Sequence, residues 1–319
     1  MHSLDYNTRP AKHAERVMLV KAMSKLQAFR SLESYRYIGF GATFFKDFKI
    51  IHKELGISDM ICIEIDSMNR ERFDNNVPYK CIKMVYGSST SELPKLQWDI
   101  PTIIWLDYIG KISKDSLADI TLIASKALTG SMIIVTLNAE NAATDDDIEI
   151  ADTDRTNHLK KLELRVGESN VPLGTTNKDL VKWGTAEVYR KIIFNKIQDS
   201  LVSRNGVKTD PNKMIYEQLF YYEYADGAKM VTIGGVFYEK GQEHLKANCM
   251  FQSLPFIRNS SDPYHIEIPI LTTREIQYLE ANMPEQNIET IPRKGIPKEE
   301  IQKYSAIYKE FPNFAAIEM

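Results

Sequence analysis

Carboxylates follow two short apolar runs in the first third of the chain. Glu64 and Asp66 follow residues 60–63, and Asp107 follows residues 102–106. A carboxylate can accept hydrogen bonds from both hydroxyls of a ribose. At the end of a buried strand it can also orient or deprotonate a nucleophile, or ligate a divalent cation. These residues therefore indicate a nucleoside site, with Asp107 as the candidate for chemistry.

A glycine turn precedes the first carboxylates. Gly39 and Gly41 lie between an aromatic and β-branched run and a helix-period segment. The segment's apolar residues recur at i, i+4, i+7 and i+11, and they are Phe44, Phe48, Ile51 and Leu55. A carboxylate about 20 residues beyond such a turn lies where doubly wound folds hold a ribose. Because glycine has no Cβ, Gly39 and Gly41 are predicted to contact the ligand, although a plain strand-to-helix turn is the alternative.

Two assignments within this predicted site stay open. Glu64 is our preferred ribose ligand and Asp66 its rival, since one of them could instead cap a helix that begins near Met68. Ser88 and Ser89 follow a predicted strand at residues 81–86. Their hydroxyls could bond adenine nitrogens or only stabilise a turn.

Strands that alternate with helices must position these residues. Strands are predicted at residues 60–63, 81–86, 102–106 and 131–137, with a helix at 116–128 that ends before Gly130. This order favours a mostly parallel, doubly wound α/β sheet. Its carboxyl edge would carry the following polar strand ends: Gly39, Glu64, Gly87, Asp107 and Asn138. Later, two β-rich runs separated by residues 225–227 predict an antiparallel hairpin.

The remaining segments are predicted to surround this sheet. Residues 1–30 contain a covering helix, 11–28, with Leu19, Met23 and Leu26 buried. Its charged residues are expected on a solvated face, and they are Lys12, Glu15, Arg16 and Lys25. Anion binding by Arg9, Lys12 and Arg16 is the less favoured alternative. Residues 31–240 form the main domain. Within it, residues 139–215 are predicted to be an insertion that could act as a lid, with an acidic cluster at 145–149 and a helix at 186–201. Residues 241–319 form an α+β extension for substrate or partner contacts.

Composition excludes several classes of protein. The net charge of -3 and pI of about 6.1 provide no global basic field for nucleic acid or a membrane. Three scattered cysteines and no continuous apolar leader or span predict a cytoplasmic protein outside the membrane. The histidines show no zinc spacing, and residues 106–109 lack the proline-containing sequence with which amino-methylating enzymes clamp a flipped base.

Four segments together resemble the class I S-adenosylmethionine-dependent methyltransferases, in particular bacterial O-methyltransferase-like proteins. YIGFGA resembles the glycine-rich first motif, IEID the ribose-binding end of the second strand, GSSTSELPKL the segment beside adenine, and WLDY the fourth motif. The resemblance covers residues 35–238 and implies a seven-stranded Rossmann-like sheet that ends in an antiparallel hairpin. The chain departs from the pattern at Tyr37, where the family has an acidic residue, and at Thr43 or Phe44, where it has a third glycine.

The resemblance implies S-adenosylmethionine as cofactor and methyl transfer to an oxygen of an unidentified acceptor. It implies Asp107 and Tyr108 as catalytic residues. The implied cofactor contacts are Gly39, Gly41, Glu64, Asp66, Ser88, Ser89 and Asp107. A metal-dependent variant would use Asp107 with Asn138, Glu140 and Asn141, but Lys111 is misplaced for the base of such enzymes, so no metal is predicted.

Two alternatives remain. A methyltransferase-like binding component of a bacterial complex, without turnover, would explain Tyr37 and the altered turn. A nicotinamide dehydrogenase is less favoured, because such a fold would repeat its βαβ unit where this chain ends on a hairpin.

Overall fold

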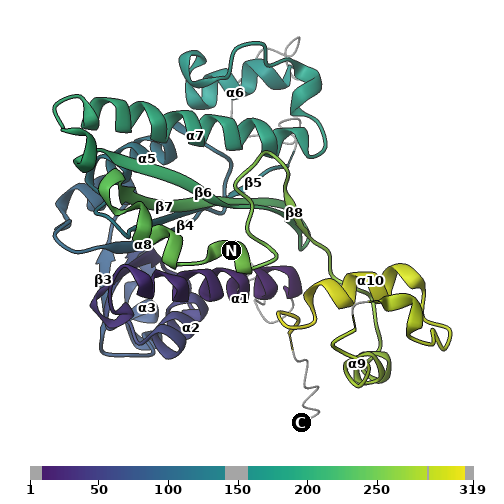
Figure 1. The fold of residues 1–319 in the computed structure, drawn as a ribbon. Helices are drawn as coiled ribbons and strands as arrows, with labels where there is room; N and C mark the ends of the chain where they lie inside the picture. The colour runs from purple at the N-terminus through teal and green to yellow at the C-terminus, as the bar shows by residue number, and fades with distance from the viewer. Residues whose placement is uncertain (1–8, 141–156, 286, 313–319) are drawn as a thin grey trace.

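The computed structural model describes residues 9–140, 157–285 and 287–312, which form a single eight-stranded sheet with helices on both faces (Figure 1). The strand order is β3-β2-β1-β4-β5-β7-β6-β8. The strands are β1 (Arg36–Phe40), β2 (Asp59–Glu64), β3 (Ile82–Tyr86), β4 (Thr102–Asp107), β5 (Met132–Asn138), β6 (Met214–Ala225), β7 (Lys229–Glu239) and β8 (Tyr264–Ile266). β1 to β5 are parallel, and β7 runs antiparallel between β5 and β6. The predicted parallel sheet and hairpin are confirmed, and β8 adds an eighth strand from the C-terminal extension.

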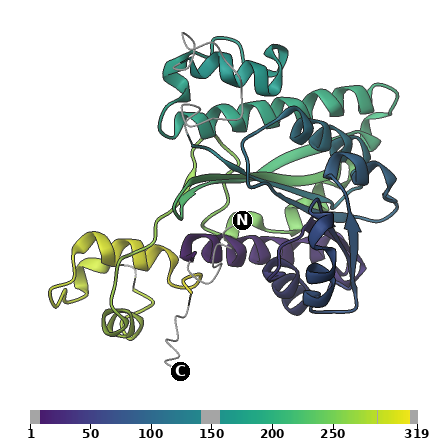
Figure 2. The same ribbon diagram turned by 180° about the vertical axis from the view of Figure 1, so that it is seen from behind.

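The central strands are apolar on both sides because each side is covered by helices. In β4, Ile103 and Trp105 pack into one buried cluster, while Ile104 and Leu106 pack into the other. The first side carries α1 (Pro10–Ser24), α2 (Lys46–Leu55), α3 (Arg70–Asn76) and α8 (Glu243–Asn248), as Figures 1 and 2 show. The second carries α4 (Ser89–Glu92), α5 (Lys114–Lys126), α6 (His158–Val166) and α7 (Gly184–Asn205).

The predicted solvated face of α1 is wrong. Lys12, Glu15 and Arg16 are only 3%, 0% and 5% exposed, although Leu19 and Met23 are buried as expected. Small residues on the same helix, Ala11, Ala14 and Ala22, are fully buried and let α1 lie close to the sheet. Buried charges then require partners, and α1 finds them in distant strands.

The predicted apolar stripe of α2 is wrong at its first member. Phe48, Ile51 and Leu55 are buried, but Phe44 is 38% exposed because the helix begins only at Lys46. Phe45 is buried instead, in a left-handed conformation with φ of 49°. The bulky residues after the glycines therefore make a turn of their own.

Helix α7 belongs to the layer that covers the sheet and is therefore not a lid. Its residues Ile192, Ile193 and Ile197 are buried in the same cluster as Ile133 and Val135 of β5. The predicted acidic cluster at 145–149 lies outside the described residues.

The C-terminal extension has two parts. Phe251, Phe256 and Ile266 pack in the same cluster as α1 and β1. By contrast, α9 (Thr273–Glu280) and α10 (Lys298–Ile307) project to the side of the sheet (Figures 1 and 2). They share a small apolar cluster made by Leu279, Ile291, Ile296, Ile301 and Tyr304. Thr272 and Glu275 form a capping box at the start of α9.

Candidate functional site

The predicted site residues gather at the carboxyl edge of the parallel strands. Gly39 of β1 pairs in register with Cys62 of β2 and Trp105 of β4. Glu64 and Asp107 are the last residues of β2 and β4. Parallel pairing therefore brings together residues that are far apart in the sequence.

Gly41 and Glu64 depend on each other. The Gly41 amide donates to the Ile63 carbonyl oxygen at 2.8 Å, and a Cβ on Gly41 would lie 2.5 Å from Glu64 Oε2. Glu64 is 8% exposed, and its Oε1 accepts a 2.8 Å hydrogen bond from the Asp66 amide. Burial raises the pKa of Glu64, while the bond from the Asp66 amide opposes the rise. A carboxylate acceptor thus lies beside bare backbone.

Asp66 caps a short helix. Its Oδ1 accepts from the Asn69 amide at 3.2 Å, and its Oδ2 accepts from Asn69 Nδ2 at 2.7 Å. These hydrogen bonds lower the pKa of Asp66. Of the two carboxylates, Asp66 is therefore the helix cap, and a ribose contact by Asp66 stays a prediction.

Tyr37 fills the space above the first glycine. A Cβ on Gly39 would lie 2.6 Å from the Tyr37 hydroxyl. The phenol is 1% exposed and packs edge-on against Phe48, with ring centroids 5.0 Å apart. Burial raises the pKa of Tyr37 well above 10, and Asp47 and Asp107 raise it further. A neutral phenol therefore stands where the family has an acidic residue.

Ser88, Ser89 and Tyr108 are engaged with local partners. Ser88 Oγ caps α4 by accepting from the Ser91 amide at 3.2 Å. The Ser89 hydroxyl and the Tyr108 hydroxyl both donate to Asp119 Oδ2, the latter at 2.7 Å. Asp119 is 1% exposed, and burial raises its pKa. Sequence reasoning missed Asp119, although its place within the buried stripe of α5 was a signal.

Asp107 is paired with a lysine of α1. Lys12 Nζ donates to Asp107 Oδ1 at 2.8 Å and lies 2.8 Å from Glu15 Oε2. It also lies 4.6 Å from the ring centroid of Trp105. Burial alone would lower the pKa of Lys12, but Asp107 and Glu15 raise it well above 10.5. Lys12 is therefore a buried cation, and sequence analysis missed its position at the site.

Glu15 continues this network into the sheet. It accepts hydrogen bonds from the Thr232 hydroxyl of β7 and from the Tyr224 hydroxyl of β6, the second at 3.2 Å. The hydroxyl oxygens of Thr232 and Thr136 are 2.8 Å apart, and Trp105 Nε1 donates to Thr136 at 3.0 Å. Four strands thus share one polar network with α1.

Two further contacts anchor α1. Asp226, at the tip of the β6–β7 hairpin, accepts from the Lys12 amide at 2.8 Å and from the Ala11 amide at 3.3 Å. Arg16 pairs with Asp47 in the first turn of α2. The N-terminal helix is therefore fixed to the hairpin tip and to the glycine turn.

The ends of β5 and β7 use their polar side chains locally. Asn138 Oδ1 accepts from the Glu140 amide at 2.7 Å, and Glu140 Oε1 accepts from the Lys229 amide at 2.8 Å. Asn141 lies outside the described residues. Among the residues that the structure places, no group of three or more histidines, cysteines, aspartates or glutamates could hold a metal ion.

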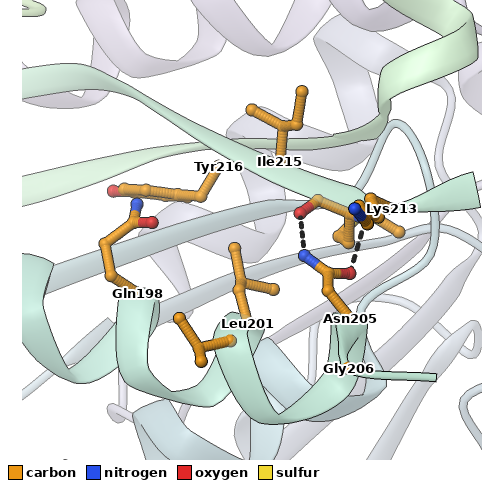
Figure 3. A pocket seen from close by; sticks show the side chains of 9 residues that line it. Gln198, Leu201, Asn205, Gly206, Lys213, Ile215 and Tyr216 are labelled. Carbon is orange, nitrogen blue, oxygen red and sulfur yellow. Dashed lines mark hydrogen bonds between the residues drawn. The ribbon is translucent and has the colours of Figure 1, made fainter. Parts of the chain in front are cut away.

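A cavity of about 380 Å³ lies at the opposite, amino edge of the sheet (Figure 3). It is lined by the end of α7 and the start of β6, where Asn205 exchanges two 2.8 Å hydrogen bonds with the backbone of Met214. Val236 of β7 pairs with Met132, the first residue of β5, and Met214 of β6 pairs with Glu239, which follows Val236 along β7. Met214 therefore lies past the amino end of β5. This cavity is therefore separate from the candidate site.

Five parallel strands followed by an antiparallel hairpin, with a glycine turn after the first strand and an acidic residue ending the second, define the class I methyltransferase fold. Within this class the chain belongs to the family described as "Putative O-methyltransferase", whose model matches residues 4–319. No curated protein matches the chain.

Solved structures show low sequence identity to the chain. Trm1 from Pyrococcus horikoshii, in complex with S-adenosyl-L-methionine, is 12% identical, with 72% of this chain and 57% of that chain covered and a TM-score of 0.44. A putative O-methyltransferase from Klebsiella pneumoniae is 12% identical, with 74% and 82% covered and a TM-score of 0.37. The match to a mutant of MtNAS covers 32% of this chain and 37% of that one, at 12% identity and a TM-score of 0.25. The chain thus spans less than two thirds of Trm1 and of MtNAS.

No helix within the described ranges has the length and apolar character needed to cross a bilayer.

Proposed function

We propose that the protein is a cytoplasmic S-adenosylmethionine-dependent methyltransferase that acts on an oxygen of an acceptor still to be identified. The observation that carries this proposal is the Glu64 carboxylate beside the bare backbone of Gly41, at the carboxyl edge of adjacent strands. Membership of an O-methyltransferase family supports the same reaction. The three cysteines are free thiols, which fits a reducing compartment.

The proposed cofactor residues divide by the part of the ligand they meet. Glu64 accepts from the ribose hydroxyls. The backbone at Gly41, and at Gly39 on the side away from the Tyr37 hydroxyl, meets the methionine part. Ser88 and Ser89 border adenine together with the loop that Asp66 caps. A Cβ at Gly41 would fill the space beside the carboxylate, so the residues present fit the group.

Asp107 is the proposed catalytic residue. S-adenosylmethionine supplies an electrophilic methyl group when bound. Asp107 would orient the acceptor hydroxyl in line with the bond between the methyl carbon and sulfur and would take the hydroxyl proton. The carbon–oxygen bond would form as the carbon–sulfur bond breaks, with S-adenosylhomocysteine as the leaving group. Lys12 holds Oδ1 of Asp107, so Oδ2 is the oxygen proposed for this task.

Tyr108 has a supporting part in this proposal. Its hydroxyl donates to Asp119, and burial raises its pKa well above 10, so it stays protonated and is not the base in this proposal. Its ring packs edge-on against Phe40 at 5.0 Å between centroids. Tyr108 therefore fixes the segment that follows Asp107.

Isothermal titration of the wild-type protein with S-adenosylmethionine and S-adenosylhomocysteine tests the proposal. Glu64→Gln should weaken both ligands at least about tenfold, since a neutral amide is a weaker acceptor for the ribose hydroxyls. Asp210→Asn is the matched control, because Asp210 lies before β6 at the amino edge. Unchanged affinity in Glu64→Gln would remove Glu64 from the site, and no binding by wild type would overturn the cofactor assignment.

A binding component without turnover is the second candidate. It is favoured by the Tyr37 hydroxyl over Gly39 and by the ion pair that occupies one oxygen of Asp107. Methyl transfer from labelled S-adenosylmethionine to a cell extract would separate the two candidates. Cofactor binding without any labelled product across extracts of matched growth conditions would favour this second candidate.

A further inference from the structure

Lys12, Glu15 and Asp107, here named the Lys12 triad, form a charge cluster in which Asp107 is the member that reaches the surface. The side chains of Lys12 and Glu15 are 4% and 0% exposed, whereas that of Asp107 is 25% exposed. Lys12 Nζ lies 2.8 Å from a carboxylate oxygen of each partner. The cluster therefore connects the interior beneath α1 with the carboxyl edge through Asp107.

The triad carries a formal charge of -1, from one lysine and two carboxylates. Other titratable groups face it from four elements: Arg16 on α1, Tyr37 on β1, Asp47 on α2, and Tyr222 and Tyr224 on β6. From the tip of the β6–β7 hairpin, Asp226 accepts from the amides of Lys12 and Ala11. Arg16 and Asp47 cancel each other as an ion pair. Burial raises the pKa of each of the three tyrosines well above 10, so they stay neutral. The Asp226 carboxylate is held by the first-turn amides of α1, so the charge of -1 next to Asp107 is that of the triad itself.

Stability alone does not account for this arrangement. Burying ions costs desolvation energy, and apolar residues of similar volume are often at least as stable as a buried ion pair. The triad also lies where β4 ends, next to the strand that carries the glycine turn. Its charge is therefore placed at the part of the site where methyl transfer is proposed.

We propose that Lys12 is a positioning residue that, held by Glu15, fixes Asp107 and the net charge of -1 at the methyl-transfer end of the site. This charge makes the site prefer the sulfonium cation of S-adenosylmethionine to the neutral thioether of S-adenosylhomocysteine. The inference rests on the proposed function. It assigns α1 a part in the preference of the site for S-adenosylmethionine over the product S-adenosylhomocysteine.

The test is the ratio of the dissociation constants of S-adenosylhomocysteine and S-adenosylmethionine, measured by titration calorimetry between about pH 6 and 8.5. The two ligands share the same amino acid end, so its titration largely cancels in the ratio. For wild type we expect a ratio above one that changes little with pH. Burial already raises the pKa of Glu15 while Lys12 opposes the rise. Without the Lys12 cation that opposition is lost, so Glu15 takes up a proton that it loses as pH rises.

Lys12→Met should therefore show a ratio that rises with pH by on the order of tenfold. Lys12→Met combined with Glu15→Gln should give a flat profile again, because Asp107 is then the one remaining charge. A structural role for Lys12 would not produce this recovery. Lys161→Met is the matched control, since Lys161 is a buried lysine of α6, and it should follow wild type.

Glu15→Gln alone keeps the experiment decisive if Lys12→Met does not fold. Its triad has no net charge, so the ratio should fall by on the order of tenfold at every pH. A wild-type ratio in Glu15→Gln would overturn this inference while leaving the proposed function intact. Failure of wild type to bind either ligand would instead overturn the proposed function and this inference with it.

Discussion

At the scale of single residues, the candidate site depends on one contact between a glycine and a carboxylate. Because Gly41 has a hydrogen atom where other residues have a Cβ, Glu64 Oε2 can lie next to its Cα. The same carboxylate is buried and accepts the Asp66 amide. Both its position and its charge can therefore be changed separately.

Gly41→Ala changes the position. The added Cβ would meet Glu64 Oε2 at 2.5 Å, Glu64 Cβ at 3.1 Å and Cys62 Sγ at 3.2 Å. The flexible carboxylate can rotate away, and the other two contacts need only small shifts. We expect cofactor affinity to fall about tenfold, with the free energy of unfolding changed by less than about 1 kcal/mol. Calorimetry and thermal unfolding measure the two effects. Gly110→Ala, where a Cβ meets no atom within 4 Å, should change neither.

The charge of Glu64 can be changed by pH. Burial raises its pKa above the ordinary 4.5, so the carboxyl is protonated, and a poorer acceptor, up to a higher pH than usual. Adenosine binding should therefore strengthen as pH rises through this raised pKa and be constant above it. Fluorescence titration with adenosine, which has no amino acid end, would show the rise. Glu64→Gln should give a flat profile, and a rise that persists in that variant would assign it to another group.

Sequence reasoning predicted that Glu64, Gly41 and Asp107 lie at the carboxyl edge of the sheet, because each ends or follows an apolar run that is itself a strand. It missed Lys12 and Glu15 because their partners are distant: Asp107 is 95 residues from Lys12, and Thr232 is 217 residues from Glu15. A local pattern of charges on a helix resembles a solvated face unless the small residues beside it are read as a sign of close packing. Ala11 and Ala14, which are fully buried, are the small residues that indicate close packing of this helix.

At the scale of elements, α1 is the helix that brings Lys12 to Asp107 at the candidate site. Asp226 from the hairpin tip caps its first turn by accepting from the amides of Ala11 and Lys12, and Glu15 lies one turn after Ala11. The α1 helix was predicted correctly as an element, but its orientation could not be predicted, because the cap comes from a residue 214 positions away. The position of Lys12 at Asp107 therefore depends on the contact between the start of α1 and Asp226 at the hairpin tip.

Asp226→Ala should loosen the start of α1. Loss of an N-cap costs about 1 kcal/mol of stability, and the displaced Lys12 should also weaken binding of S-adenosylmethionine. Chemical denaturation and calorimetry measure these effects. Thr272→Ala removes the capping box of α9, so it should cost similar stability without any change in affinity. Equal affinities in the two variants would show that the hairpin tip does not position α1 for binding.

At the scale of the whole molecule, the chain combines one large sheet with a small appended unit. The sheet was predictable because five parallel strands are continuous apolar runs between turn residues. The appended unit was predictable only as part of an α+β extension, since its packing depends on a few residues. It contacts the main body through the Lys21–Glu310 ion pair and through Ile307, which joins the main cluster.

These two parts should unfold with different stabilities. Leu279→Ala removes a fully buried side chain from the α9–α10 cluster and should cost about 2–5 kcal/mol there. Because few residues connect this unit to the sheet, the loss should increase hydrogen exchange in α9 and α10 only, with β1, β4 and β5 unchanged. Ile134→Ala, in the core of β5, should raise exchange throughout the sheet. If Leu279→Ala raised exchange in the central strands as well, α9 and α10 would belong to the same cooperative unit as the candidate site. They would then not be a separate unit that serves substrate or partner contacts.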